Sequence, residues 1–97
     1  MEKLSEEKIM SELSQLTGWS YADGSIRKTF STKNFVQTMG LAAALGTLCQ
    51  QHDHHPDYMT IKYSSIDISF STHSVKGVTS KDIEIARDIE SINITAK

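Results

Sequence analysis

The stretch "YMTIKYSSIDISFST", residues 58–72, decides the fold because it predicts two strands joined by a short turn. Its second half alternates apolar with polar side chains: Ile66, Ile68 and Phe70 against Asp67, Ser69 and Ser71. A period of two gives a strand one apolar face and one polar face. We therefore predict strands over residues 58–63 and 65–72.

A second hairpin is expected upstream, over residues 19–30, with the sequence "WSYADGSIRKTF". Its Asp23-Gly24 pair is typical of a two-residue type I′ turn, in which both residues adopt positive φ. The two hairpins together would supply the strands of one antiparallel sheet.

Helical patterns flank and separate these hairpins, over residues 5–17, 32–51 and 80–95. The long middle segment carries two apolar stripes, one of Phe35, Met39, Ala42 and Cys49 and the other of Leu41, Leu45 and Leu48. Two stripes indicate a helix that is buried on more than one side or that packs against a partner chain. The element order predicts an α+β fold, a four-stranded antiparallel sheet with three helices packed on one face.

Composition limits the class of protein. The chain of 97 residues, 38% hydrophobic and 23% charged, has globular composition and the length of a single domain, 1–97. A core of this size is modest, so oligomerisation would add stability. A net charge of −2 without a run of Lys or Arg weighs against nucleic acid or an anionic membrane as the partner.

The remaining class signals concern redox state and location. The single cysteine, Cys49, excludes an intrachain disulfide and a four-cysteine zinc site. The amino-terminal "MEKLSEEKIM" lacks the apolar core of a secretory signal, and no apolar run is long enough to cross a membrane. We therefore expect a cytoplasmic protein.

Three of the four histidines lie in "HDHHPDY", residues 52–58. Pro56 disfavours helical backbone at His55, which places the cluster between the long helix and the third strand. The fourth histidine, His73, keeps the polar parity of the strand over 65–72 and is expected to end it. If the two strands pair as a hairpin, the cluster and His73 meet at one end of the sheet.

Ordinary structural roles compete with functional ones in this region. His52 suits the last turn of the long helix, where a cation favours the negative end of the dipole. Asp53 could cap the chain locally or orient a neighbouring imidazole, and the sequence favours neither. Asp82 fits a capping box, "TSKD" at residues 79–82, that opens the last helix.

A lone loop histidine is usually solvated, but the adjacent pair His54-His55 with His73 nearby favours a functional site. Imidazole binds zinc, copper and nickel, yet the HxHH spacing lacks a recognised zinc pattern, and adjacent histidines would usually diverge rather than chelate. Acid–base catalysis fits better, because histidine titrates near neutral pH and one imidazole can donate a proton while another accepts one. Such chemistry suits elimination of water and needs no cofactor or metal.

The order and spacing of these residues resemble the signature of the pterin-4a-carbinolamine dehydratase family. The matching residues are His54-His55-Pro56, the aromatic Tyr63, His73 at the end of "STH", and Asp82. Gly18-Trp19, Phe30 and Phe35 agree more loosely, so the resemblance spans most of the chain. Gln50 stands where the family usually has an acidic or other charged residue, and His52 falls at a position that the signature leaves free.

The resemblance implies dehydration of 4a-hydroxytetrahydropterin to quinonoid dihydropterin, the step that recycles the cofactor of aromatic amino-acid hydroxylases. It assigns His54, His55 and His73 to the catalytic set, one protonating the departing 4a-hydroxyl and another accepting the N5 proton or binding the pterin edge. Asp53 and Asp82 would orient imidazoles or bind the pterin ring.

The resemblance also implies homodimers or homotetramers, and some animal members of the family bind a transcription factor through their helical surface. Two alternatives therefore remain beside the enzyme. The chain could be a non-enzymatic interaction module that uses the long helix, or a histidine-based metal-binding protein.

Overall fold

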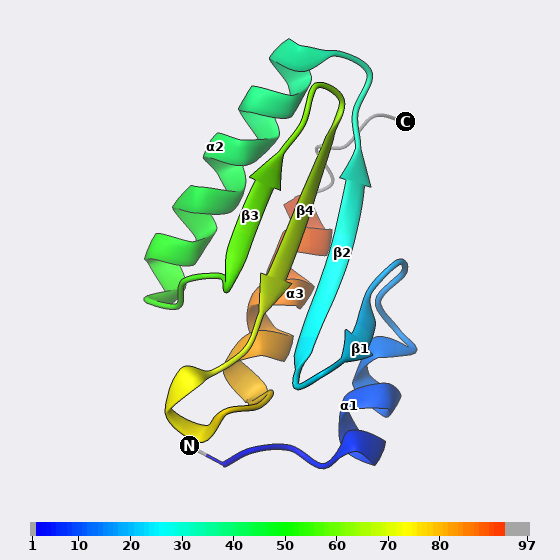
Figure 1. Cartoon of the computed structure of the whole chain (residues 1–97), viewed down its shortest axis with the longest axis vertical. Coiled ribbons are helices and arrows are strands. Elements are labelled where there is room, and N and C mark those ends of the chain that lie inside the picture. Colours follow the sequence, from blue (N-terminus) through cyan, green and yellow to red (C-terminus); the bar gives the residue numbers. More distant parts are fainter. Residues whose placement is uncertain (1, 93–97) are drawn as a thin grey trace.

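The structure is a computed structural model that describes residues 2–92 (Figure 1). Its elements are α1 (Glu6–Leu13), β1 (Ser20–Ala22), β2 (Ser25–Ser31), α2 (Phe35–His52), β3 (Tyr58–Ile61), β4 (Ser65–Phe70), the short 3₁₀ helix η1 (His73–Val75) and α3 (Ser80–Ile92). The predicted α+β fold is confirmed, because three α-helices and a four-stranded antiparallel sheet follow in the expected order within these residues. None of these helices has both the length and the apolarity needed to cross a bilayer.

The two predicted hairpins join through their second strands. The strand order is β1-β2-β4-β3, and every neighbouring pair is antiparallel. Asp23 and Gly24 have φ of 52° and 80°, as a type I′ turn requires. Tyr58 pairs with Ser69, so the start of β3 lies beside the end of β4. This register places the histidine cluster next to the residues that follow β4.

One face of the sheet packs against all three helices to form the core. The alternating residues Ile66, Ile68 and Phe70 of β4 are fully buried, as their pattern predicted. They share one apolar cluster with side chains from each helix, among them Leu13, Leu45 and Ile89. Trp19 lies in the same core and donates its Nε1–H to Glu90 Oε2 at 2.9 Å, and α3 passes behind the sheet in Figure 1.

Helix α2 buries one apolar stripe and exposes the other. Leu41, Leu45 and Cys49 are buried, whereas Phe35 and Met39 are about half exposed. The prediction that Cys49 belongs to the Phe35 stripe was therefore wrong. Cys49 lies four residues after Leu45, so the two side chains share one face of the helix. Because α2 contains no Asp, Glu, Lys or Arg, its outward face is also uncharged.

The strand predicted over residues 65–72 ends early, at Phe70. His73 begins η1 and does not end a strand, so that prediction was wrong. The chain instead turns back on itself, because Thr72 and Gly77 form an isolated antiparallel bridge.

Other boundaries shift by a few residues. Helix α1 ends at Leu13 rather than at residue 17, because the Leu16 N–H turns back to the Leu13 carbonyl oxygen at 2.9 Å. Strand β3 ends at Ile61 rather than at residue 63. Residues 93–95 of the helix predicted over 80–95 lie outside the described residues.

Candidate active site

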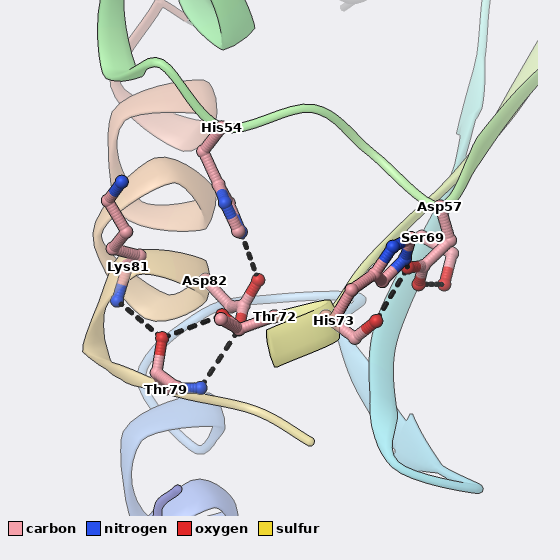
Figure 2. Close-up of polar contacts among 9 residues, drawn as sticks. His54, Asp57, Ser69, Thr72, His73, Thr79, Lys81 and Asp82 are labelled. Atoms are coloured by element: carbon pink, nitrogen blue, oxygen red, sulfur yellow. Dashed lines mark hydrogen bonds and ion pairs between the residues drawn. The ribbon is translucent and has the colours of Figure 1, made fainter. Parts of the chain in front are cut away.

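Segments from across the chain converge at one end of the sheet around a cavity of about 260 Å³. They are the α2–β3 connection, the two residues that follow β4, and η1, and Asp82 at the start of α3 contacts His54 of this group (Figure 2). The cavity is lined by Asp53, His54, His55, Pro56, Ser71, Thr72, His73 and Ser74. The structure thus brings His54, His55 and His73 together as predicted, although His73 comes from η1.

His54 is a buried imidazole that is fixed from several sides. Its backbone N–H donates to the Cys49 carbonyl oxygen at 3.0 Å, which closes the carboxyl end of α2. Its Nε2 lies 2.5 Å from Asp82 Oδ1, and its ring stacks on Phe70 with centroids 6.1 Å apart. Because an ionised carboxylate only accepts, Nε2 carries the proton of this pair.

Asp82 serves two structural purposes at once. Its side chain is 0% exposed, and its Oδ2 accepts from the Thr79 backbone N–H and the Thr72 hydroxyl, both at 2.9 Å. The Asp82 side chain thus forms its half of the predicted capping box, whereas Thr79 Oγ1 accepts from the backbone N–H of Lys81, the second residue of α3, at 3.2 Å and not from that of Asp82. The same carboxylate therefore caps α3 through one oxygen and holds His54 through the other, as Figure 2 shows.

A second His–Asp pair, His73 with Asp57, lies on the other side of the cavity (Figure 2). The His73 side chain is 83% exposed, and its Nε2 lies 3.1 Å from Asp57 Oδ1. Ser69 Oγ and Ser71 Oγ donate to the same carboxylate at 2.8 and 2.5 Å. Asp57 was not among the residues predicted from the sequence. The sequence signal for it was a set of polar side chains two residues apart, Ser69 and Ser71, together with an aspartate directly before the strand that pairs with β4.

His55 and Asp53 line the cavity without a side-chain hydrogen bond among the described residues, and both are exposed. Asp53 has a positive φ of 52° and ends α2, with its backbone N–H directed at the Cys49 and Gln50 carbonyl oxygens. The local role expected of Asp53 is thus confirmed. Orientation of an imidazole by its carboxylate is not found within residues 2–92.

Two further groups near the cluster lie outside the cavity lining. His52 occupies the last turn of α2, as predicted, and its Nε2 lies 2.7 Å from Asp88 Oδ2 on α3. Burial raises the pKa of the Cys49 thiol, which keeps the thiol protonated and weakly reactive at neutral pH.

Neither a metal site nor a second hollow competes with this cavity in the part of the chain that the structure describes. Within residues 2–92, no group of three or more His, Cys, Asp or Glu side chains is arranged to hold a metal ion. A larger hollow of about 600 Å³ lies on the open face of the sheet, lined by Ser20, Arg27, Thr29, Tyr58, Thr60, Asp67 and neighbouring residues. It contains no histidine. We therefore place the candidate active site in the smaller cavity, which three imidazoles line.

Comparisons with known proteins show the family of the chain. A family model described as "Pterin 4 alpha carbinolamine dehydratase" matches residues 2–92. A protein from Sulfolobus acidocaldarius, whose name assigns it provisionally to the pterin-4-alpha-carbinolamine dehydratases, is 38% identical over 90 residues, which cover 93% of this chain and 98% of that protein. The solved structure of a transcriptional coactivator/pterin dehydratase from Brucella melitensis is 31% identical with a TM-score of 0.88, covering 98% of this chain and 100% of that chain. A pterin dehydratase-like RuBisCO assembly factor of the alpha-carboxysome shares the fold, with a TM-score of 0.66 at 14% identity, covering 80% of this chain and 89% of that chain.

Proposed function

Because this chain belongs to the pterin 4 alpha carbinolamine dehydratase family, we propose that it dehydrates 4a-hydroxytetrahydropterin to quinonoid dihydropterin. The observation that carries the proposal is the gathering of His54, His55 and His73 around one cavity, two of them paired with aspartates. The reaction breaks the C4a–O bond and releases the protonated hydroxyl as water. Loss of the N5 proton leaves a C4a=N5 double bond, so the step needs one proton donor and one acceptor.

The size of the cavity supports a small ring as the substrate. Pockets for drug-sized ligands measure about 300–1,000 Å³. A cavity of about 260 Å³ therefore suits the bicyclic pterin ring. The substituent on the ring would extend into solvent, so the site would accept more than one pterin.

The exposures of the three imidazoles support a division of labour. His54 is buried and its Nε2–H is engaged by Asp82, so we assign it to binding the pterin edge from a fixed position. His55 and His73 are exposed and face the cavity, so they can exchange protons with both substrate and water. We assign the protonation of the 4a-hydroxyl and the removal of the N5 proton to these two residues.

The two aspartates named by the sequence would then act differently. The Asp53 carboxylate is exposed at the cavity and has no side-chain hydrogen bond within residues 2–92, so it is available to accept from the N–H groups of the pterin. Asp82 is buried behind His54 and would act on the substrate only through that imidazole.

The cellular setting forms part of the same proposal. A cytoplasmic dehydratase of this kind would recycle the tetrahydropterin cofactor of an aromatic amino-acid hydroxylase. We propose that the protein is a homodimer or homotetramer that uses the outward face of α2. Val36 on this face is 82% exposed, Phe35 stacks on Tyr63 at 6.0 Å, and the helix carries no Asp, Glu, Lys or Arg to oppose association.

The same face favours a second candidate, a non-enzymatic interaction module. An exposed apolar helix surface can receive a different protein as readily as a second copy of this chain. Different substitutions should abolish the two candidate functions. Turnover should depend on the cavity histidines, whereas a pure binding role should depend on Val36 and its neighbours.

Stopped-flow mixing with synthetic 4a-hydroxytetrahydropterin tests the proposed reaction. The protein should accelerate formation of the quinonoid product above the spontaneous rate, in proportion to protein concentration. A rate equal to that without protein, for a sample that is folded by circular dichroism, would overturn the enzymatic proposal and leave the interaction module.

A further inference from the structure

Asp57 lies between Pro56 and β3, and its carboxylate reaches three groups that follow or belong to β4. We propose that Asp57 is a positioning residue that fixes the tautomer and the orientation of His73 for proton transfer. The proposal rests on the proposed function, because the transfer in question belongs to the dehydration.

The Asp57 carboxylate is itself firmly held. The Asp57 backbone N–H donates to the Ser69 carbonyl oxygen at 2.7 Å, which fixes the main chain to β4. The Ser69 hydroxyl then donates to Oδ2 at 2.8 Å and the Ser71 hydroxyl to Oδ1 at 2.5 Å. Both oxygens are thus occupied by donors from one side of β4 and its continuation, so the carboxylate cannot turn freely. Oδ1 can accept a second hydrogen bond, and His73 Nε2 lies 3.1 Å from it.

His73 depends on this contact for its position. Its side chain is 83% exposed, and within residues 2–92 its only side-chain hydrogen bond is to Asp57. An ionised carboxylate accepts and does not donate, so the contact requires the proton of the neutral ring to be on Nε2. The lone pair of Nδ1 is then free. A partner of this kind sets which nitrogen of a histidine reacts and how the ring is oriented.

Two other His–Asp pairs show why this one bears on the reaction. The pair of His54 and Asp82 is buried and also caps α3, so its loss would change the fold as well as the site. The pair of His52 and Asp88 has similar separation, 2.7 Å, but His52 is absent from the cavity lining. Asp88 therefore provides a matched control, an aspartate that holds an imidazole outside the site.

The experiment compares Asp57→Asn with Asp88→Asn in two measurements. An asparagine can present its carbonyl oxygen or its amide to His73, so both ring tautomers become acceptable. In ¹⁵N NMR spectra of the imidazoles, recorded at several pH values, His73 should change from the Nε2–H form to a mixture of tautomers. In stopped-flow dehydration, kcat should fall by about 10–100-fold, the size of loss seen when the partner that orients a metal-bound histidine is removed. KM should stay within about threefold, because substrate contacts remain.

Asp88→Asn should alter the NMR signals of His52 alone and leave kcat unchanged. If Asp57→Asn fails to fold in thermal unfolding, Ser71→Ala replaces it. This variant frees one side of the carboxylate and should shift the His73 signals and kcat in the same direction by a smaller factor.

An Asp57→Asn variant with unchanged His73 tautomer, or with unchanged kcat beside an active wild type, would overturn the proposal while the dehydratase function stands. A wild type without activity would overturn the function itself. In that case a changed tautomer in Asp57→Asn would still support the positioning of His73 by Asp57, and an unchanged tautomer would overturn it.

Discussion

Replacing Asp82 with alanine should destabilise the protein by about 1.5–5 kcal/mol, because the side chain is fully buried and holds two donors that have no second acceptor within residues 2–92. The Thr79 N–H loses its capping contact, and the loss of such a cap costs about 0.5–2 kcal/mol. The His54 Nε2–H is left unpaired in a buried position, which costs about 1–3 kcal/mol. The Thr72 hydroxyl adds little, because Thr79 Oγ1 remains 2.8 Å away.

Urea unfolding at neutral pH measures this loss, with the fluorescence of the buried Trp19 as the signal. The matched control is Asp88→Ala, which removes the partner of His52 from a half-exposed pair and should change stability by less than about 0.5 kcal/mol. A loss below about 1 kcal/mol for Asp82→Ala would mean that the two donors are satisfied in another way, against this prediction.

Three other predictions concern the exposed face of α2, metal dependence and the Asp67 carboxylate. Val36→Asp should lower the association state seen by sedimentation at micromolar protein concentrations. Met10→Asp, a change at an exposed position on α1, should not lower it. A wild type that is already a monomer would contradict the α2 interface. Dialysis against a strong chelator should leave dehydratase activity intact, and a loss that zinc restores would support the metal-binding alternative. Hydrogen bonds from Thr29 and Lys62 hold the pKa of the Asp67 carboxyl below its usual value. The ionised carboxylate therefore stabilises the fold above about pH 4, and this stabilisation is lost as pH falls through the lower native pKa. Asp67→Asn should therefore lower the urea midpoint at about pH 7 and match the wild type at strongly acidic pH. An equal difference in midpoint at both pH values would contradict this pH dependence.

Local patterns predicted the parts of the fold that depend on near neighbours. Alternation in β4 marked the buried residues Ile66, Ile68 and Phe70, and the Asp23-Gly24 pair marked a turn that needs two positive φ values. The division of the α2 stripes was not predictable in this way. Which side of that helix is buried depends on how it sits on the sheet, and the sequence period alone does not determine this.

The candidate site shows the same limit. The spacing of His54, His55, His73 and Asp82 named the residues, yet the parity of polar residues wrongly extended the strand to His73. The chain leaves the strand because it closes a turn on Gly77, in which Lys76, rather than the glycine, has a positive φ of 53°. Asp57 was not predicted as a site residue, because its contact with His73 exists only once β3 and β4 are paired in the observed register.

We expect the cavity histidines, and not His52, to carry out the dehydration. Stopped-flow dehydration by His55→Ala and His73→Ala, compared with His52→Ala, tests it most directly. Loss of one general acid or base typically costs about 10²–10⁴-fold in rate, so we predict that each of the first two variants slows the reaction substantially. His52→Ala should stay within a few-fold of the wild type, because its partner Asp88 holds it outside the cavity lining. If His52→Ala were the most damaging variant while His55→Ala and His73→Ala stayed active, the assignment of the site would be wrong.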